Sequence, residues 1–266
     1  MISRKQMAAG LALATAIAAA GGAMAHTSYL LPSVFSTAAD KTVTIQASFA
    51  ERQFFRPEVA VTSDDFHLLR PDGKRDTYDR TETFKQVTIL ESDLTEPGTY
   101  RFTTGERLGR VGSQVFENGD WHAVEPGKSA PAGAKTRTSQ TVTVAEAYVT
   151  KGAPTRPAVD APAGRLAIRT DAHPNEIFLE KPLTISLVFD GKPLAGQDIE
   201  LDREGGGFEE PRYHKELKTG ADGKLRITFD RPGTYLIMTR HAAPAPQGSG
   251  TDMRSFTTSL TFEVLR

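Results

Sequence analysis

The sequence predicts an all-β protein that folds as two β-sandwich domains in tandem. The first observation is a series of short runs rich in β-branched residues, such as TVTIQASF (42–49) and LTISLVF (183–189), separated by Gly, Pro and Asp turns. Apolar and polar residues alternate in several of these runs, as in half-buried antiparallel strands, and no helical period is sustained. The second observation is a central stretch, VTKGAPTRPAVDAPAG (149–164), whose Pro, Ala and Gly content is typical of a linker.

The two halves of the chain also echo each other. EPGTYRF (96–102) in the first half matches RPGTYLI (231–237) in the second. A Pro-Gly turn that leads into a Tyr-bearing strand is common late in immunoglobulin-like sandwiches, where the Tyr packs at the end of the sheet. The second half also contains FDGKPLAG (189–196) and GADGK (220–224), a pattern similar to that of transthyretin-like or carboxypeptidase-regulatory-like modules.

The predicted fold is therefore two immunoglobulin-like or transthyretin-like β-sandwich domains. We expect an N-terminal domain over residues 26–145, a linker over 146–164 and a C-terminal domain over 165–266. Each domain has about 100 residues, an ordinary size for a sandwich.

Residues 1–25 have the features of a secretory signal peptide. Two basic residues precede an apolar stretch from Met7 to Ala20, and Ala23-Met24-Ala25 gives the small-x-small cleavage pattern. The apolar stretch is shorter than the roughly 20 residues that span a bilayer, so we expect no permanent anchor. We predict export to the periplasm and cleavage after Ala25, which makes His26 the first mature residue.

The composition limits the possible functions. The chain of 266 residues has a formal charge of −1, and removal of the signal peptide leaves 30 basic residues against 33 acidic ones. This balance gives no electrostatic footprint for nucleic acid or an anionic membrane. There are no cysteines, so a metal site needs His, carboxylate, Met or the amino terminus. No G-x-S-x-G, P-loop, Rossmann or H-x-x-x-H spacing occurs, and we expect no enzyme.

The position of His26 suggests a metal-binding site. Its free α-amino group and imidazole can close one chelate ring on Cu, Ni or Zn. The alternative is that signal peptidase simply tolerates His after the cut. Further ligands must come from distant parts of the chain: we select His67 and His241, which are expected on or at the end of strands, with Glu51 and His122 in reserve. Structural or solvated roles stay open for each of these histidines. We expect His173, before a proline, in a turn, and His214, among charges, at the surface.

Several segments in order along the chain carry a family resemblance. They are AHTSYLLP at the mature start, SFAERQFFRPEVAV, FHLLRPDG, PGTYRF, the KPLAG and ADGK turns, and the terminal TSLTFEVL. Together they resemble a periplasmic family of unknown function (DUF4198-like) described as the periplasmic component of cobalt/nickel transport. The resemblance covers essentially the whole mature chain. It implies a secreted β-sandwich protein that binds a transition metal ion (Ni, Co, Cu or Zn) through His26 and passes it to an outer- or inner-membrane transporter.

Two other functions remain as alternatives. A copper-dependent oxidase of the lytic polysaccharide monooxygenase kind also begins with a chelating His on a β-sandwich, but it needs a second facing His and usually a flat aromatic surface, and this chain has a single Trp. A non-catalytic carbohydrate-binding or adhesion module would make His26 incidental. Metal content of the mature protein separates the last alternative, and oxygen consumption with copper and a reductant separates the oxidase.

Overall fold

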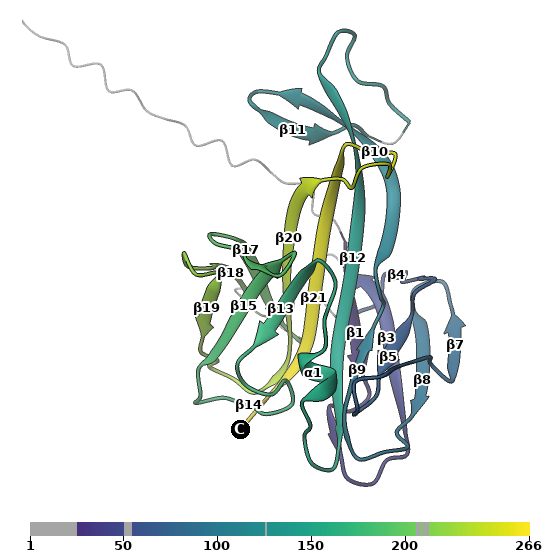
Figure 1. The fold of residues 1–266 in the computed structure, drawn as a ribbon, viewed down its shortest axis with the longest axis vertical. Coiled ribbons are helices and arrows are strands. Elements are labelled where there is room, and N and C mark those ends of the chain that lie inside the picture. The colour runs from purple at the N-terminus through teal and green to yellow at the C-terminus, as the bar shows by residue number, and fades with distance from the viewer. Residues whose placement is uncertain (1–25, 51–54, 126, 206–208, 210–212) are drawn as a thin grey trace, which may run out of the picture.

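The computed structural model describes residues 26–50, 55–125, 127–205, 209 and 213–266. The predicted signal peptide and Glu51 lie outside these residues. In the described part nearly all the regular secondary structure is strand, and the single helix, α1 (Pro157–Asp160), has four residues. No helix in that part is long and apolar enough to cross a membrane. The all-β prediction is confirmed (Figure 1).

One continuous sheet runs through the whole molecule and joins its two halves. Its strands, in spatial order, are β18 (His214–Lys218), β17 (Asp198–Arg203), β20 (Gly233–Pro244), β21 (Met253–Leu265), β12 (Thr136–Lys151), β9 (Gly98–Thr103), β5 (His67–Leu69) and β6 (Arg75–Asp76). β12 and β21 are parallel neighbours, and Ser139–Ala147 pairs residue by residue with Met253–Thr261. Backbone hydrogen bonds therefore connect the N-terminal and C-terminal halves. Two short strands pair with this sheet, β2 (Ser36–Thr37) with β12 and β14 (Ile177–Phe178) with β21.

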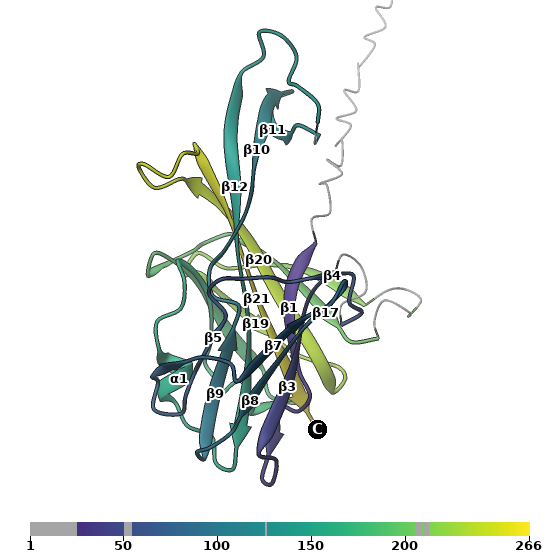
Figure 2. The ribbon, with the colours of Figure 1, turned by 90° about the vertical axis from the view of Figure 1, so that its right-hand side faces the viewer.

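Two smaller sheets cover opposite faces of the long sheet (Figures 1 and 2). The N-terminal one contains β1 (Thr27–Pro32), β3 (Thr42–Ala50), β4 (Val59–Ala60), β7 (Arg80–Thr83) and β8 (Thr88–Asp93). The C-terminal one contains β13 (Leu166–Thr170), β15 (Leu183–Phe189), β16 (Lys192–Pro193) and β19 (Lys224–Ile227). Successive side chains of a strand point to opposite faces. On β12, Ala147 and Val149 accordingly pack in the first core, whereas Tyr148 packs in the second.

Each half has its own hydrophobic core. Residues 30–149 supply the first core, which includes the fully buried side chains of Leu30, Ile45, Leu90 and Phe102. Residues 148–264 supply the second, which includes Ile185, Leu187, Leu201, Ile237 and Phe262. Burying one such side chain stabilises the fold by about 1.5–3 kcal/mol, and no disulfide is needed.

The two repeated Pro-Gly-Thr-Tyr segments adopt the same structure. Tyr100 on β9 donates its hydroxyl hydrogen to the backbone oxygen of Glu96 at 3.0 Å, and Tyr235 on β20 donates to Arg231 at 2.7 Å. Both bonds reach four residues back, as in the tyrosine corner of immunoglobulin-like sandwiches. Gly98 and Gly233 precede them with φ of 124° and 131°, a conformation that a side chain would strain. Both segments form a Pro-Gly turn that leads into a Tyr-bearing strand, as the sequence predicts.

The stretch expected to be a linker, 146–164, is instead folded into the body. Its first residues continue β12, where Val149 is fully buried, and α1 then buries Val159 in the second core. The guanidinium of Arg101 donates a hydrogen bond to the carbonyl oxygen of Pro162 at 2.8 Å. Proline is well tolerated at the first position of a helix, so this composition marks a packed turn here. The linker assignment is corrected accordingly.

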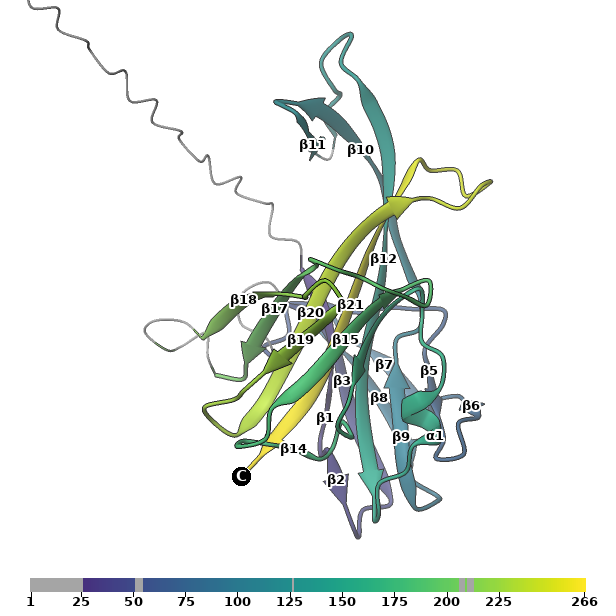
Figure 3. The same ribbon diagram turned by 60° about the vertical axis from the view of Figure 1, so that its left-hand side comes forward.

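An arm projects from one end of the long sheet (Figures 1 to 3). It consists of β10 (Arg107–Glu117), β11 (Asp120–Ala123) and the first residues of β12. β10 lies between the other two strands and pairs antiparallel with both. The turn between β10 and β11 places Asn118 at φ 55° and Gly119 at φ 88°, as a two-residue type I′ hairpin requires.

Candidate metal-binding site

His26 immediately precedes β1, beside the carboxylate of Glu58, which immediately precedes β4. β1 pairs with β3, where Thr27 is opposite Ala50, and β4 pairs with the same end of β3. The backbone N–H of Glu58 donates to the oxygen of Phe49 at 3.2 Å, which holds Glu58 against this end of β3. His26 Nε2 is then 3.2 Å from Glu58 Oε2, and the two side chains are 45% and 34% exposed.

The contact with Glu58 places a carboxylate beside Nε2 of His26 and leaves Nδ1 on the other side of the ring. A carboxylate accepts hydrogen bonds, so a neutral ring that carries its proton on Nε2, toward Glu58, presents Nδ1 with a free lone pair. Nδ1 is the ring nitrogen nearer the backbone, and it is the one that closes a chelate ring with the α-amino group of an N-terminal histidine. Metal-binding histidines usually donate their other N–H to a carboxylate or carbonyl, which fixes the ring and raises its basicity. Glu58 stands in that position.

A buried tyrosine lies on β1 three residues after His26. Tyr29 is 0% exposed and meets Phe55 edge to face, with ring centroids 5.3 Å apart. Its hydroxyl oxygen accepts a hydrogen bond from the side-chain amide of Gln46 at 2.6 Å. Burial, with a smaller effect of the Glu58 charge, raises the pKa of Tyr29 far above its usual value. Tyr29 is therefore a neutral structural support and not a phenolate ligand.

His67 lies on β5, opposite Thr103 of β9, at the far side of the long sheet. Its Nδ1 is 2.6 Å from the backbone oxygen of Asp65, so Nδ1–H donates and Nε2 can accept a metal ion. Burial lowers the pKa of His67 and keeps the ring neutral. It lines a pocket of about 150 Å³ together with Arg101 and Glu146.

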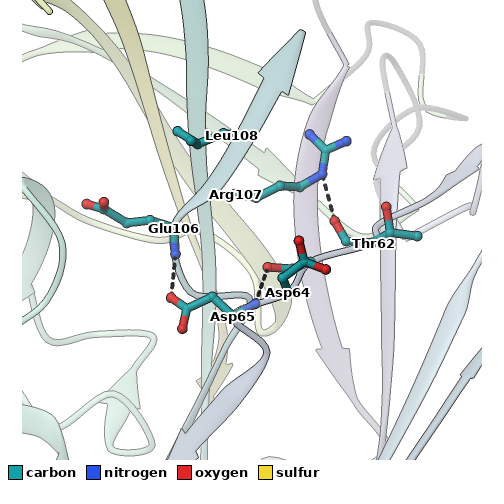
Figure 4. A pocket seen from close by; sticks show the side chains of 7 residues that line it. Thr62, Asp64, Asp65, Glu106, Arg107 and Leu108 are labelled. Atoms are coloured by element: carbon teal, nitrogen blue, oxygen red, sulfur yellow. Dashed lines mark hydrogen bonds between the residues drawn. The ribbon is translucent and has the colours of Figure 1, made fainter. Parts of the chain in front are cut away.

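A second pocket, of about 320 Å³, adjoins this region (Figure 4). Asp65 and Glu106 line it, but Asp65 already accepts hydrogen bonds from the Glu106 N–H at 3.1 Å and from Arg75 at 2.6 Å. Burial raises the pKa of Asp65, but these bonds outweigh that effect and hold the pKa below its usual value. Arg107 donates to the backbone oxygen of Thr62 at 2.8 Å across the pocket. The polar groups of this pocket are largely hydrogen-bonded to one another, so we assign no ligand to it.

His241 lies on β20, opposite Phe256, near the end of the strand as the sequence predicts. Its Nδ1 is 3.2 Å from the side-chain oxygen of Gln197, and its ring centroid is 4.7 Å from that of Phe189. Burial lowers the pKa of His241, although Asp190 acts in the opposite direction. Like His67, it is a neutral histidine with one nitrogen available.

The structure does not bring His67 and His241 together. β5 and β20 are separated by four steps in the long sheet, or about 19 Å at about 4.8 Å per step. Metal–nitrogen bonds of about 2.0–2.1 Å cannot close that gap. Among the described His, Asp and Glu residues, the one group of three or more that is placed to share an ion contains neither of them, nor His26. The proposed three-histidine centre is therefore not formed, and metal binding by each single histidine stays a prediction.

The group that the structure does bring together is Glu200, Asp202 and His214. Asp202 on β17 is opposite His214 on β18, and Glu200 is on the same face two residues earlier. One ligand atom from each lies within 4.8 Å of the others. His214 Nδ1 is 3.1 Å from Asp202 Oδ1. Burial, and to a smaller extent the charges of Asp202 and Glu216, raise the pKa of Glu200 against the opposing effects of His214 and Arg240. Such a mixed carboxylate and imidazole set can hold a transition metal ion.

The other histidines are in different surroundings from those expected. His173 does lie in a turn, but it is 7% exposed and hydrogen-bonded on both ring nitrogens. His214, expected at the surface, is half-buried against Asp202. His122 is exposed on β11.

Sequence reasoning missed Glu58, Glu200 and Asp202. The period of two in DIELDR (198–203) places Glu200 and Asp202 on one face of a strand, which is a readable signal. Nothing local marks Glu58, because only the pairing of β1 and β4 with β3 brings it to His26.

Residues 23–243 match the family named Domain of unknown function (DUF4198). The chain belongs to this family. The suspected family membership is thus confirmed, and the family name assigns no activity. A search of curated proteins finds no match.

Similar solved structures show weak likeness over most of the chain. The D0-D1 domain of intimin is 11% identical, with 91% of this chain and 100% of that chain covered and a TM-score of 0.21. Trypsin-activated α-2-macroglobulin from Escherichia coli is 9% identical, with coverage of 89% and 16% and a TM-score of 0.24. The amphioxus IgVJ-C2 molecule is 10% identical, with coverage of 87% and 99% and a TM-score of 0.19. At these scores the likeness carries no argument about function.

Proposed function

We propose that the mature protein is an exported periplasmic binding protein that holds one transition metal ion at its N-terminal histidine. It delivers nickel or cobalt, or alternatively copper or zinc, to a membrane uptake system without turning over a substrate. The observation that supports this proposal most strongly is the contact between His26 Nε2 and Glu58 Oε2 at 3.2 Å. A neutral ring with its proton on Nε2, toward Glu58, has Nδ1 available to bind the ion together with the mature α-amino group.

The chemistry of this pair suits a borderline metal ion. Amine and imidazole nitrogens favour Ni, Cu, Co and Zn over ions that prefer oxygen, and thiolate competition is absent in a chain without cysteine. His26 is 45% exposed, so an ion can enter and leave without unfolding of the sandwich. Open coordination positions facing solvent suit a protein that passes its ion to a partner.

Titration calorimetry with Ni²⁺ on the mature protein tests this proposal. His26→Ala should abolish tight binding, and Glu58→Gln should weaken it by about 10–100-fold, as for other residues that orient a ligand. His122→Ala, which removes an exposed histidine on the arm, is the matched control and should bind as the wild type does. Binding should weaken as the pH falls, because protons compete with the metal ion for nitrogen ligands.

The same titration distinguishes the second metal-binding group. If the ion occupies Glu200, Asp202 and His214, then His214→Ala loses binding and His26→Ala keeps it. That result would contradict the assignment to the N-terminus. Wild-type affinity in every variant would contradict a specific metal site altogether.

A further inference from the structure

The tip of the arm has two chemically different faces. Residues that pair across antiparallel strands point to the same side. Phe116 is opposite Trp121, and Gln114 is opposite both Ala123 and Arg137. Glu117 and Asp120 are opposite each other, one residue out of phase, and so belong to the other face. Lys135 lies over the rings of Phe116 and Trp121. The cationic-aromatic face, as we call it, consists of Gln114, Phe116, Trp121, Ala123, Lys135 and Arg137, and it includes no carboxylate.

The aromatic rings of this face are covered by its own cations. Phe116 and Trp121 have ring centroids 5.2 Å apart. The Arg137 guanidinium lies 4.1 Å above the Trp121 ring, and the Lys135 amine lies 5.2 Å from the Phe116 ring. A sugar that stacks on tryptophan needs a bare ring face, so this arrangement disfavours a carbohydrate. It offers two cations held on an apolar base, and Phe116 is still 40% exposed.

The arm is also electrostatically distinct from the body. Residues 107–138 contain five basic and three acidic side chains, a formal charge of +2. The rest of the mature chain contains 25 basic and 30 acidic side chains, a formal charge of −5. Pairing of β12 with β21 ends at Ser139, and Lys135 is four residues further, or about 13 Å at about 3.3 Å per residue. This exceeds the Debye length of about 8 Å at physiological salt, so the body repels an anionic surface only weakly at the tip.

We propose that the cationic-aromatic face docks the protein onto an anionic phospholipid surface. Lysine and arginine near such a surface attract lipid phosphates, and tryptophan favours the interface between headgroups and acyl chains. The exposed apolar residues Leu108 and Val111 on β10, each 55% exposed, extend the same arm toward its base. The net negative charge of the whole chain gives no sign of this local positive charge on the arm. The proposal does not depend on metal binding at His26.

The chain contains its own reporter for this contact. Trp121 is the only tryptophan, so intrinsic fluorescence reports the arm tip alone. Mature, metal-free protein should be titrated with vesicles of phosphatidylethanolamine and phosphatidylglycerol and with vesicles of phosphatidylcholine. The first should shift Trp121 emission to shorter wavelength and protect it from acrylamide, whereas the second should do neither. About 1 M salt, where the Debye length is about 3 Å, should reverse the shift.

Matched variants locate the contact. Lys135→Gln with Arg137→Gln should reduce partitioning by about thirty-fold, the loss expected for two basic residues near an anionic surface. Lys85→Gln with Lys192→Gln removes the same charge from exposed positions off the arm and should change partitioning less than twofold. Circular dichroism and vesicle co-sedimentation confirm folding and binding independently of the fluorescence. Emission that ignores anionic vesicles, an equal response to phosphatidylcholine, or equal losses in both variants would overturn the proposal. The first of these results would favour a protein partner for this face.

Discussion

A buried polar cluster fastens the two halves of the molecule together, and its removal should weaken the whole fold. Asn175, from the C-terminal half, donates its side-chain amide to the backbone oxygen of Tyr148 at 2.9 Å. It accepts a hydrogen bond from the Thr150 hydroxyl at 2.8 Å. Thr150 also contacts the hydroxyl of Thr99, which in turn lies 3.0 Å from His173 Nε2. Asn175 is 6% exposed, so water cannot replace these bonds.

The expected loss in Asn175→Ala follows from those two bonds. A buried polar group that loses its partner costs about 1–3 kcal/mol, and the Tyr148 carbonyl and the Thr150 hydroxyl are both affected. Because Thr150 keeps its contact with Thr99, its share lies at the low end. We therefore expect a loss of about 2–4 kcal/mol in the free energy of unfolding. For a domain of 150–250 residues each kcal/mol lowers Tm by about 2–4 °C.

Urea unfolding followed by circular dichroism measures this loss. Gln86→Ala, which shortens an exposed polar side chain, is the control and should change stability by less than about 0.5 kcal/mol. The shared long sheet predicts that wild-type protein unfolds in one transition. A loss below about 0.5 kcal/mol in Asn175→Ala, or two separate wild-type transitions, would refute the claim that this polar cluster and the long sheet connect the two halves.

Three further outcomes follow from the structure. Glu146→Gln should cost about 3 kcal/mol or more in urea unfolding at a pH where Glu146 is ionised, because it leaves the buried Arg101 guanidinium, 3.4 Å from Glu146, without its counter-charge. Burial raises the pKa of Glu146, so this loss should shrink as the pH falls. An unchanged midpoint at every pH would contradict this. Limited trypsin digestion should cut at the exposed Lys128 before it cuts at Lys151, because the Lys151 amine donates a hydrogen bond to the backbone oxygen of Leu94. Mass spectrometry of the early fragments tests this order, and earlier cleavage at Lys151 would contradict it. Burial lowers the pKa of His173, so the unfolded chain binds a proton more readily than the folded chain does. Stability should therefore fall as the pH drops below about 6.5. Thermal melts at several pH values should show that Tm depends less steeply on pH in His173→Gln than in the wild type.

The parts of the fold that could be predicted from sequence are those fixed by local patterns. The period of two identified strands, and the repeated Pro-Gly-Thr-Tyr segments identified equivalent corners, because Tyr100 and Tyr235 each bond only four residues back. The connection between the two halves could not be predicted, because β12 and β21 pair across more than 100 residues of chain and nothing local marks a parallel partner. The Pro and Ala content of 149–164 is compatible both with a linker and with a short buried helix, so composition could not distinguish them.

The candidate site divides in the same way. His26 follows from the cleavage pattern alone, whereas its neighbour Glu58 depends on strand pairing. His67 and His241 were correctly expected at strand positions, but the order of strands within a sheet keeps them apart. Charge totals likewise concealed the arm, since the cations around Trp121 become visible only when the register separates them from Glu117.

The central claim is that the α-amino group of His26 binds the metal ion together with its imidazole. The most direct test compares Ni²⁺ titration of mature protein that begins at His26 with protein that retains Ala25, since this single residue removes the amine and leaves every other side chain unchanged. Retention of Ala25 should reduce the affinity at least 100-fold, while circular dichroism and the melting temperature stay the same. Equal affinity in the two proteins would contradict the claim.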